Sequence, residues 1–136
     1  MQNVKKLIFL MKNLFIEVEM FTKENRRDIL NSFLQTIKSI SDIAYQKRAW
    51  IRGEPPGTDF DETVNNYSLD ANGIFRNYKD FNITENQIEI LKEFDKRFRR
   101  FYKTNDWPPQ FIDTPEWNEI TEMAKEVLKA FHYPEA

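Results

Sequence analysis

The segment from Trp50 to Glu62, with the sequence WIRGEPPGTDFDE, constrains the fold more than any other part of this chain. It contains two of the three glycines and two of the six prolines. Gly53 suits the end of a helix, and Pro55-Pro56 blocks continuation, because proline has no N–H to donate and its ring clashes with the preceding turn. The segment therefore separates one helical region from the helices that follow.

Before this segment, apolar residues recur at helical spacing. Thr22 can cap a helix through its hydroxyl, and the pattern predicts one helix from about Lys23 to Arg48–Ile51. A helix with so broad an apolar face is expected to be central in the fold. The residues expected on its inward stripe are Leu30, Phe33, Leu34, Ile37, Ile40, Ala44 and Ile51.

After the segment, two helices are marked by their caps. Thr58 or Asp59 can cap a helix that begins at Phe60, and Gly73 favours a break near its end because glycine is a poor helix former. Thr84-Glu85-Asn86-Gln87 is a capping box, which opens a second helix that ends near Lys103. Its expected inward residues are Ile88, Leu91, Phe94, Phe98 and Phe101 or Tyr102.

The last helix follows a stiff connector. Trp107-Pro108-Pro109 cannot lie inside a helix, whereas Thr114 can cap the next helix with Pro115 at its first position. Its expected buried face consists of Trp117, Ile120, Ala124, Val127, Leu128 and Phe131. Short connections favour antiparallel neighbours, so the sequence predicts an all-α fold: a single domain over residues 1–136 that forms a bundle of four to five mostly antiparallel helices.

The N-terminal 20 residues fit two patterns. Residues 3–20 show a helical apolar stripe, yet Ile16, Val18 and Met20 alternate with acids as in a strand; we favour helix. A start at Met11 would make the first ten residues an extension. The apolar run that ends at Lys12 is too short for a signal peptide or a membrane span, so we expect a cytoplasmic protein that does not bind membranes.

The charge is unevenly distributed, although the net charge is only -2. Residues 1–53 carry a net charge of +5, and residues 54–136 carry -7. Two windows contain no basic residue, and their acids are Glu54, Asp59, Asp61, Glu62 and Asp70 in the first and Asp106, Asp113, Glu116, Glu119 and Glu122 in the second. If the fold joins them, their field would attract a basic partner. The simpler interpretation is that these acids keep a small domain soluble.

The sequence offers little for catalysis. There is no cysteine, and the one histidine, His132, lies close to the C-terminus. Three glycines do not form a phosphate-binding loop of a known type. Asp59-x-Asp61-Glu62 could hold a hard cation, but acids at the positive end of a helix already account for these residues. We therefore expect no enzyme activity, no cofactor and no metal.

Basic residues alternate with aromatics from Lys96 to Lys103, as on some single-strand-binding surfaces. Against nucleic-acid binding, Phe98 and Phe101 are expected to point inward, and the domain is acidic. Glu93–Arg97 and Asp95–Arg99 are favourable pairs four residues apart, and the basic cluster could also pair with an acidic window. We expect no direct nucleic-acid binding.

The three tryptophans, Trp50, Trp107 and Trp117, all lie near expected helix ends. Tryptophan at such positions more often covers a core than binds a partner. An aromatic side chain beside acids nevertheless suits a surface that binds a cationic partner.

Four stretches resemble a known group of proteins: Trp50–Pro56, Asp59–Glu62, Phe111–Trp117 and Ala124–Leu128. Together they span about residues 45–131, and they resemble small acidic bacterial proteins that act as immunity partners of polymorphic and contact-dependent inhibition toxins. The resemblance implies a non-enzymatic inhibitor of a toxin domain, often a nuclease, inside the producing cell. Its motifs are caps and turns, so it assigns no individual binding residue.

Our leading hypothesis is an immunity protein that binds and occludes a basic toxin domain, most plausibly an RNA-cleaving nuclease, through carboxylates that mimic phosphates. An alternative is a regulatory or scaffolding helical module that binds another protein through an apolar groove, and a third is an enzyme or metal protein. The residues expected to bind the partner are Glu54, Asp59, Asp61, Glu62, Asp70, Asp106, Asp113, Glu116 and Trp117.

Overall fold

The computed structural model describes residues 23–134, and this part of the chain is all-α, as predicted. The expectation for residues 3–20 lies outside the described residues. Among residues 23–134, no helix is both long and apolar enough to cross a lipid bilayer. The elements in chain order are a first helix over residues 23–41, α2 (Ile43–Gln46), the π-helix η1 (Lys47–Ile51), α3 (Phe60–Arg76), the 3-10 helix η2 (Tyr78–Phe81), α4 (Glu85–Tyr102), α5 (Pro108–Phe111) and α6 (Pro115–Ala130).

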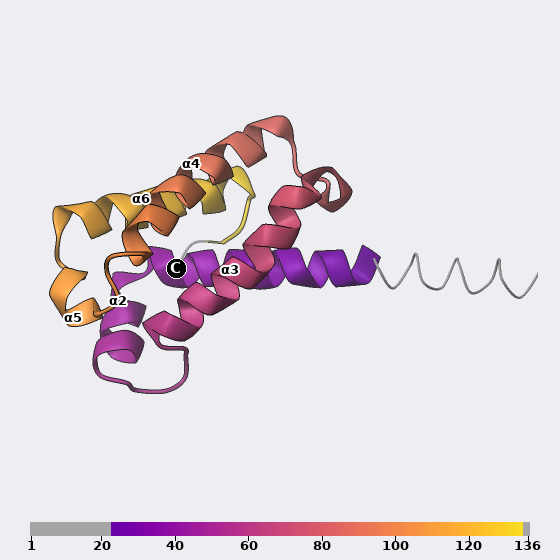
Figure 1. Cartoon of the computed structure of the whole chain (residues 1–136). Helices are drawn as coiled ribbons and strands as arrows, with labels where there is room; N and C mark the ends of the chain where they lie inside the picture. The colour runs from indigo at the N-terminus through magenta and orange to yellow at the C-terminus, as the bar shows by residue number, and fades with distance from the viewer. Residues whose placement is uncertain (1–22, 135–136) are drawn as a thin grey trace, which may run out of the picture.

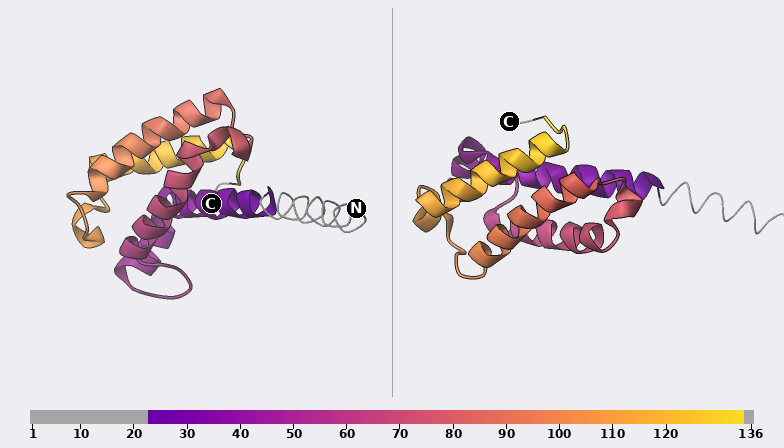
Figure 2. Two further views of the ribbon diagram at one scale, coloured as in Figure 1. Left: turned by 45° about the vertical axis from the view of Figure 1, so that its right-hand side comes forward. Right: turned by 90° about the horizontal axis from the view of Figure 1, so that it is seen from above.

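Four long helices build the body of the domain (Figure 1). α4 and α6 lie side by side and run in opposite directions, while α3 passes across the first helix at an incline (Figures 1 and 2). The core between them is rich in aromatic rings around Trp117, which has no exposed surface. The ring centroids within 4.9–6.3 Å of Trp117 belong to Trp50, Phe60, Phe98, Phe101 and Phe111.

The predicted caps of α3, α4 and α6 are confirmed, whereas that of Thr22 lies outside the described residues. Asp59 caps α3, because its Oδ1 accepts a hydrogen bond from the Glu62 N–H at 2.8 Å. Thr84 and Gln87 form the reciprocal capping box of α4. The Thr114 hydroxyl accepts from the first turn of α6. Each cap satisfies backbone donors that the first helical turn leaves without an intrahelical partner.

The single helix predicted from Lys23 to Ile51 is wrong, because it is interrupted at Asp42. Asp42 has an extended backbone (φ -113°, ψ 95°), and its carboxylate accepts from the Tyr45 N–H at 3.0 Å, so it starts a new helix. Aspartate competes with helix continuation in this way because its short side chain reaches nearby backbone donors. The chain then forms the π-helix η1, which ends at Ile51 as expected.

The interruption changes which residues face the core. Ala44 and Ile51, both expected to point inward, are exposed. Gln46 and Ala49 are buried instead. A π-turn bonds residue i to i+5 rather than i+4, so it rotates the following side chains relative to a continuous α-helix. The apolar spacing in the sequence does not reveal this rotation.

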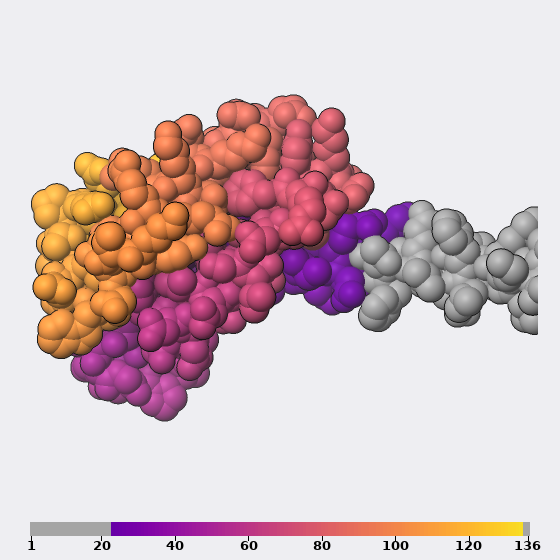
Figure 3. Space-filling view, viewed as in Figure 1, coloured from indigo at the N-terminus to yellow at the C-terminus, as the bar shows by residue number. Residues whose placement is uncertain are grey.

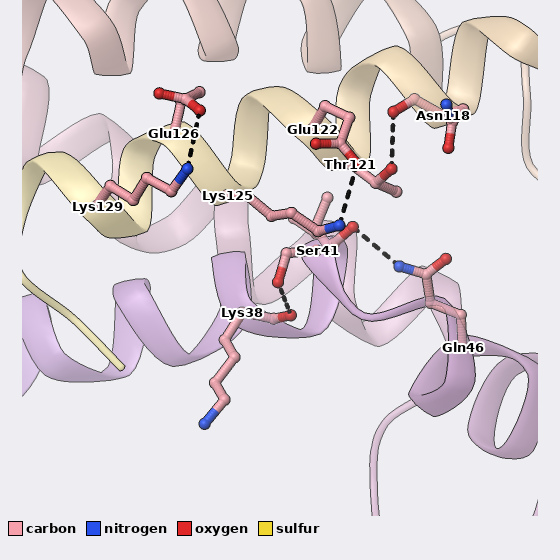
Figure 4. Close-up of polar contacts among 10 residues, drawn as sticks. Lys38, Ser41, Gln46, Asn118, Thr121, Glu122, Lys125, Glu126 and Lys129 are labelled. Carbon is pink, nitrogen blue, oxygen red and sulfur yellow. Dashed lines mark hydrogen bonds and ion pairs between the residues drawn. The ribbon is translucent and has the colours of Figure 1, made fainter. Parts of the chain in front are cut away.

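Gln46 bonds backbone carbonyls that the interruption leaves without a helical partner. Its Nε2 donates to the carbonyls of Ser39 and Ile40, each at 2.9 Å, and its Oε1 accepts from the Trp117 indole N–H at 2.8 Å. Figure 4 shows Gln46 directed at the end of the first helix, opposite α6. One fully buried amide thus satisfies carbonyls at the helix end and fixes the orientation of the central tryptophan.

Two further expectations need correction. α3 continues through Gly73 to Arg76 without the anticipated break, because tertiary packing of Ala71 and Ile74, both buried, outweighs the low helix propensity of glycine. Pro108 and Pro109, expected not to lie inside a helix, occupy the first turn of the short helix α5, where a missing N–H is not needed. Phe131, expected in the core, is only partly buried.

A pair of conservative variants tests the role of the Gln46 amide. Trp117→Phe removes the indole N–H and leaves the Gln46 Oε1 buried without a donor. Trp50→Phe removes an equally large portion of ring, but the buried Trp50 Nε1 has no acceptor within residues 23–134. We expect Trp117→Phe to lose about 1–3 kcal/mol more free energy of unfolding than Trp50→Phe. Urea denaturation followed by circular dichroism measures both; equal losses would contradict this role.

Candidate functional site

The fold brings parts of the two acidic windows to one end of the molecule. The ring of Phe60, at the start of α3, packs against that of Phe111 in α5 at 5.0 Å. η1 also contacts α5, and Figure 3 shows the surfaces of the two segments adjoining. We call this region the acidic end and define it by Glu54, Asp59, Asp61, Glu62, Asp106, Asp113 and Glu116.

Four carboxylates of the acidic end remain available for a partner. Asp61, Glu62, Asp106 and Glu116 are exposed, and none of them makes an ion pair within residues 23–134. Asp61 and Glu62 lie in the first turn of α3, and Glu116 lies in the first turn of α6, where the helix dipole favours negative charge. These side chains are therefore open to solvent.

The three other acids of the acidic end contact groups of the protein itself. Asp59 is used as the cap of α3. Glu54 lies 3.1 Å from Arg52, and Asp113 lies 3.6 Å from Lys47. Both ion pairs are exposed, and such pairs contribute little to stability. A partner that brings its own cations can replace them at small cost.

Asp70 does not belong to the acidic end. It lies about three turns beyond Asp59 along α3 and is half-buried near Ser32 of the first helix. Burial raises the pKa of the Asp70 carboxyl, although a hydrogen bond with Ser32 acts in the opposite direction. The position of Asp70 argues against the predicted role in partner binding.

The assignment of Trp117 to a partner-binding surface is wrong. Trp117 has no exposed surface, and its indole N–H is bonded to Gln46. A side chain at the centre of the core cannot touch a partner in the folded protein. The helical spacing of Trp117 on the inward face of α6 correctly predicts its burial.

The aromatic residue exposed at the acidic end is Trp107, with 63% of its surface accessible. Ile51, at the end of the neighbouring η1, is 39% exposed. The sequence contains a signal for Trp107: Pro108-Pro109 starts a helix directly after it, so Trp107 precedes the helical stripe rather than joining it. No comparable signal exists for Ile51, because its exposure follows from the π-turn.

The basic and aromatic segment from Lys96 to Lys103 has a structural role. Phe98 and Phe101 are buried, as predicted. Arg99 pairs with Asp95 at 2.8 Å, as predicted, but Arg97 bonds to Glu119 of α6 at 2.6 Å rather than to Glu93. A cation of this cluster thus pairs with an acid of the second window, one of the alternatives set out above.

Asp95 also anchors a partly buried polar link between α3 and α4. The Tyr67 hydroxyl donates to Asp95 Oδ1 at 2.6 Å, and Arg99 extends the link to Asn72 of α3 at 3.2 Å. Burial, then the Asp95 charge, raises the pKa of the Tyr67 phenol well above its usual value. Tyr67 therefore stays protonated and serves as a fixed donor in the core.

His132 and the acids of the described residues form no cluster that could hold a metal ion. His132 is exposed and has a left-handed backbone (φ 54°) just beyond the end of α6. Among residues 23–134, no three His, Cys, Asp or Glu side chains are placed to hold a metal ion. Asp59, considered above as a hard-cation ligand, caps α3 instead.

Comparison with protein-family models, curated proteins and solved structures yields no match to this chain. The fold and the site therefore define only a class of protein, namely an all-α domain with a carboxylate-rich end that contains an exposed tryptophan.

The raised pKa of Asp70 gives a pH-dependent stability prediction. Because the folded state holds the Asp70 proton more tightly than the unfolded state, this group lowers stability as the pH rises through and above the ordinary aspartate pKa, about 4. We expect Asp70→Asn to be more stable than the natural protein at pH 7 and to lose that advantage below about pH 4. Thermal unfolding across this range measures the difference. A variant less stable at pH 7 would show that the Ser32 hydrogen bond dominates.

Proposed function

We propose that this protein is a non-enzymatic immunity protein whose acidic end binds and occludes a basic toxin domain. The observation that carries the proposal is that acids of two sequence-distant windows lie at one end, where four carboxylates make no ion pair within residues 23–134. The resemblance to immunity partners of bacterial toxins supports the same conclusion.

Electrostatics determine how such a surface would act. Carboxylates without internal ion pairs project a negative field that speeds the approach of a basic partner. A nuclease presents cations where it binds the phosphates of RNA. Asp61, Glu62, Asp106 and Glu116 would take the place of those phosphates, so the inhibitor would block the substrate site without chemistry of its own.

Trp107 would supply the apolar part of the contact. Interfaces commonly contain a few aromatic anchors that provide most of the affinity, surrounded by polar residues that exclude water. An exposed indole next to Asp106 fits that composition and can also stack on a cationic side chain of the partner. Protection would be required inside the producing cell, so we place the protein in the cytoplasm.

One observation favours the second candidate, a helical interaction module. A hollow of about 430 Å³ between the first helix and α3 includes Leu69, which is 76% exposed, with Ile29 and Phe81 beside it. Leu69 is the most exposed large apolar side chain among residues 23–134. A partner helix could bury it by docking an apolar face there.

Charge reversal tests the proposed function. The four-fold variant Asp61→Lys, Glu62→Lys, Asp106→Lys and Glu116→Lys should slow association with the toxin at low salt by about tenfold or more, because steering depends on this field. The partner to test is the C-terminal domain of the large protein encoded immediately upstream. Survival of cells that express both proteins, and association rates in vitro, provide the measurements.

A matched control carries the same change of charge elsewhere. Glu24, Asp28, Asp80 and Glu93 are exposed and lie on the first helix, η2 and α4. Their reversal to Lys should leave specific protection intact. Equal loss of protection in the two variants would remove the acidic end as the binding site, and death of cells with the natural protein would reject this toxin as its partner.

Single apolar variants separate the two candidate functions. If the acidic end binds, Trp107→Ala should weaken affinity by about 2 kcal/mol or more, as expected of an aromatic anchor, while Leu69→Ala should have little effect. Binding should also weaken steeply with salt, because exposed charges are screened. Titration calorimetry at two salt concentrations measures both effects. A dominant loss with Leu69→Ala and weak salt dependence would favour groove docking.

A further inference from the structure

A hollow of about 370 Å³ lies at the acidic end, between the start of α2 and the turn that joins α5 to α6. The residues that line it are Ile43, Ile112, Asp113, Thr114, Pro115 and Asn118. Among residues 23–134, Asp113 is the one charged residue of this lining. We therefore call it the Asp113 hollow.

Part of the lining of the Asp113 hollow is apolar. Ile112 is buried in the core, and Ile43 is partly buried against it, so packing holds both side chains in place. Pro115 is exposed, and its ring is fixed at the first position of α6. An aliphatic chain that lies on these residues would remove apolar surface from water, which favours binding.

The carboxylate of Asp113 determines which charge fits the hollow. Its Oδ1 lies 3.6 Å from Nζ of Lys47, which belongs to the neighbouring η1, so an ammonium of the protein itself already contacts this carboxylate. The side chains of Lys47 and Asp113 are 48% and 80% exposed, and their separation is too long for a direct hydrogen bond. Because such an exposed pair contributes little to stability, a cation of a partner can replace Lys47 at small cost.

An anion is disfavoured here, although the N-terminus of α6 adjoins the hollow. The start of a helix attracts negative charge. In this protein the Thr114 hydroxyl already accepts from the Trp117 N–H, and Glu116 adds an exposed carboxylate in the first turn of α6. A further anion would therefore meet the carboxylates of Asp113 and Glu116.

The two other polar residues of the lining can complete the contacts of a cation without selecting its charge. Thr114 Oγ1 donates to the Phe111 carbonyl at 2.7 Å and accepts from the Trp117 N–H, so it can only accept from a ligand. The side-chain amide of Asn118 is exposed and makes no hydrogen bond within residues 23–134, so it can turn its oxygen toward a donor. The selection of charge depends on Asp113.

We propose that the Asp113 hollow receives one cationic side chain of the basic partner, whose aliphatic stem packs on Ile43 and Ile112 and whose charge replaces Lys47 at Asp113. This inference rests on the proposed function, and it assigns a place in the acidic end where a single partner residue is recognised. Lysine and arginine both join an apolar stem to a terminal cation, so both have the required chemistry. Exposed carboxylates alone would accept any cation, whereas the hollow recognises the stem and the charge together.

Two variants of the full chain, each lacking one cation of the acidic end, test the exchange. Lys47→Gln frees Asp113, and Arg52→Gln frees Glu54, whose ion pair is similarly exposed. Each variant makes this end more negative by one charge, so both should speed association with the toxin domain to the same extent. We expect Lys47→Gln alone to slow dissociation as well, by about threefold, because Lys47 no longer competes for Asp113. This slowing should vanish when Asp113→Asn is added.

A double-mutant cycle identifies the partner residue. Asp113→Asn is combined in turn with alanine replacement of each lysine and arginine of the toxin domain. We expect one of these residues to couple with Asp113 by about fivefold or more in affinity, and its identity distinguishes lysine from arginine. Asp106→Asn, at an exposed acid outside the lining, should not couple with the same residue.

The outcomes separate this inference from the proposed function. Equal dissociation rates for the Lys47→Gln and Arg52→Gln variants, or coupling of Asp113 with no single cationic residue, would overturn the inference, while the binding of the toxin by the natural protein would still support the proposed function. A natural protein that binds no toxin domain and protects no cells would reject both.

Discussion

The side chain of Gln46 holds together the part of the structure on which the rest depends. It bonds the carbonyls that end the first helix and accepts from Trp117, around which the aromatic core is arranged. A buried amide left half-satisfied would cost about 1–3 kcal/mol. With all of these contacts made, the same amide links the first helix, α2 and α6. The interruption at Asp42 is therefore a stable feature of the fold.

That interruption also shapes the surface. The restart at Asp42 and the following π-turn direct Trp50 into the core and Ile51 outward. Trp50 packs on Phe60, which in turn packs on Phe111, so the start of α3 is held beside α5. Acids that are about 50 residues apart in the sequence meet there. Core packing and the proposed binding surface thus have one structural origin.

Local signals in the sequence predicted the elements whose causes are local. The caps Asp59, Thr84 and Thr114 and the inward face of α6 follow from side chains within a few residues of each backbone group. The π-turn, the polar role of Gln46 and the exposure of Trp107 depend on contacts between distant segments. Trp117 illustrates the difference: its helical spacing predicted burial, while its acidic neighbours suggested a binding role that its burial excludes.

The claim that both acidic windows form one binding surface is tested most directly by hydrogen exchange of the protein with and without the partner toxin domain. If the account is right, binding will slow exchange both around residues 54–63 and around residues 106–118, while η2 and the start of α4 will be unchanged. Protection of only one window, or protection centred on the hollow beside Leu69, would contradict it.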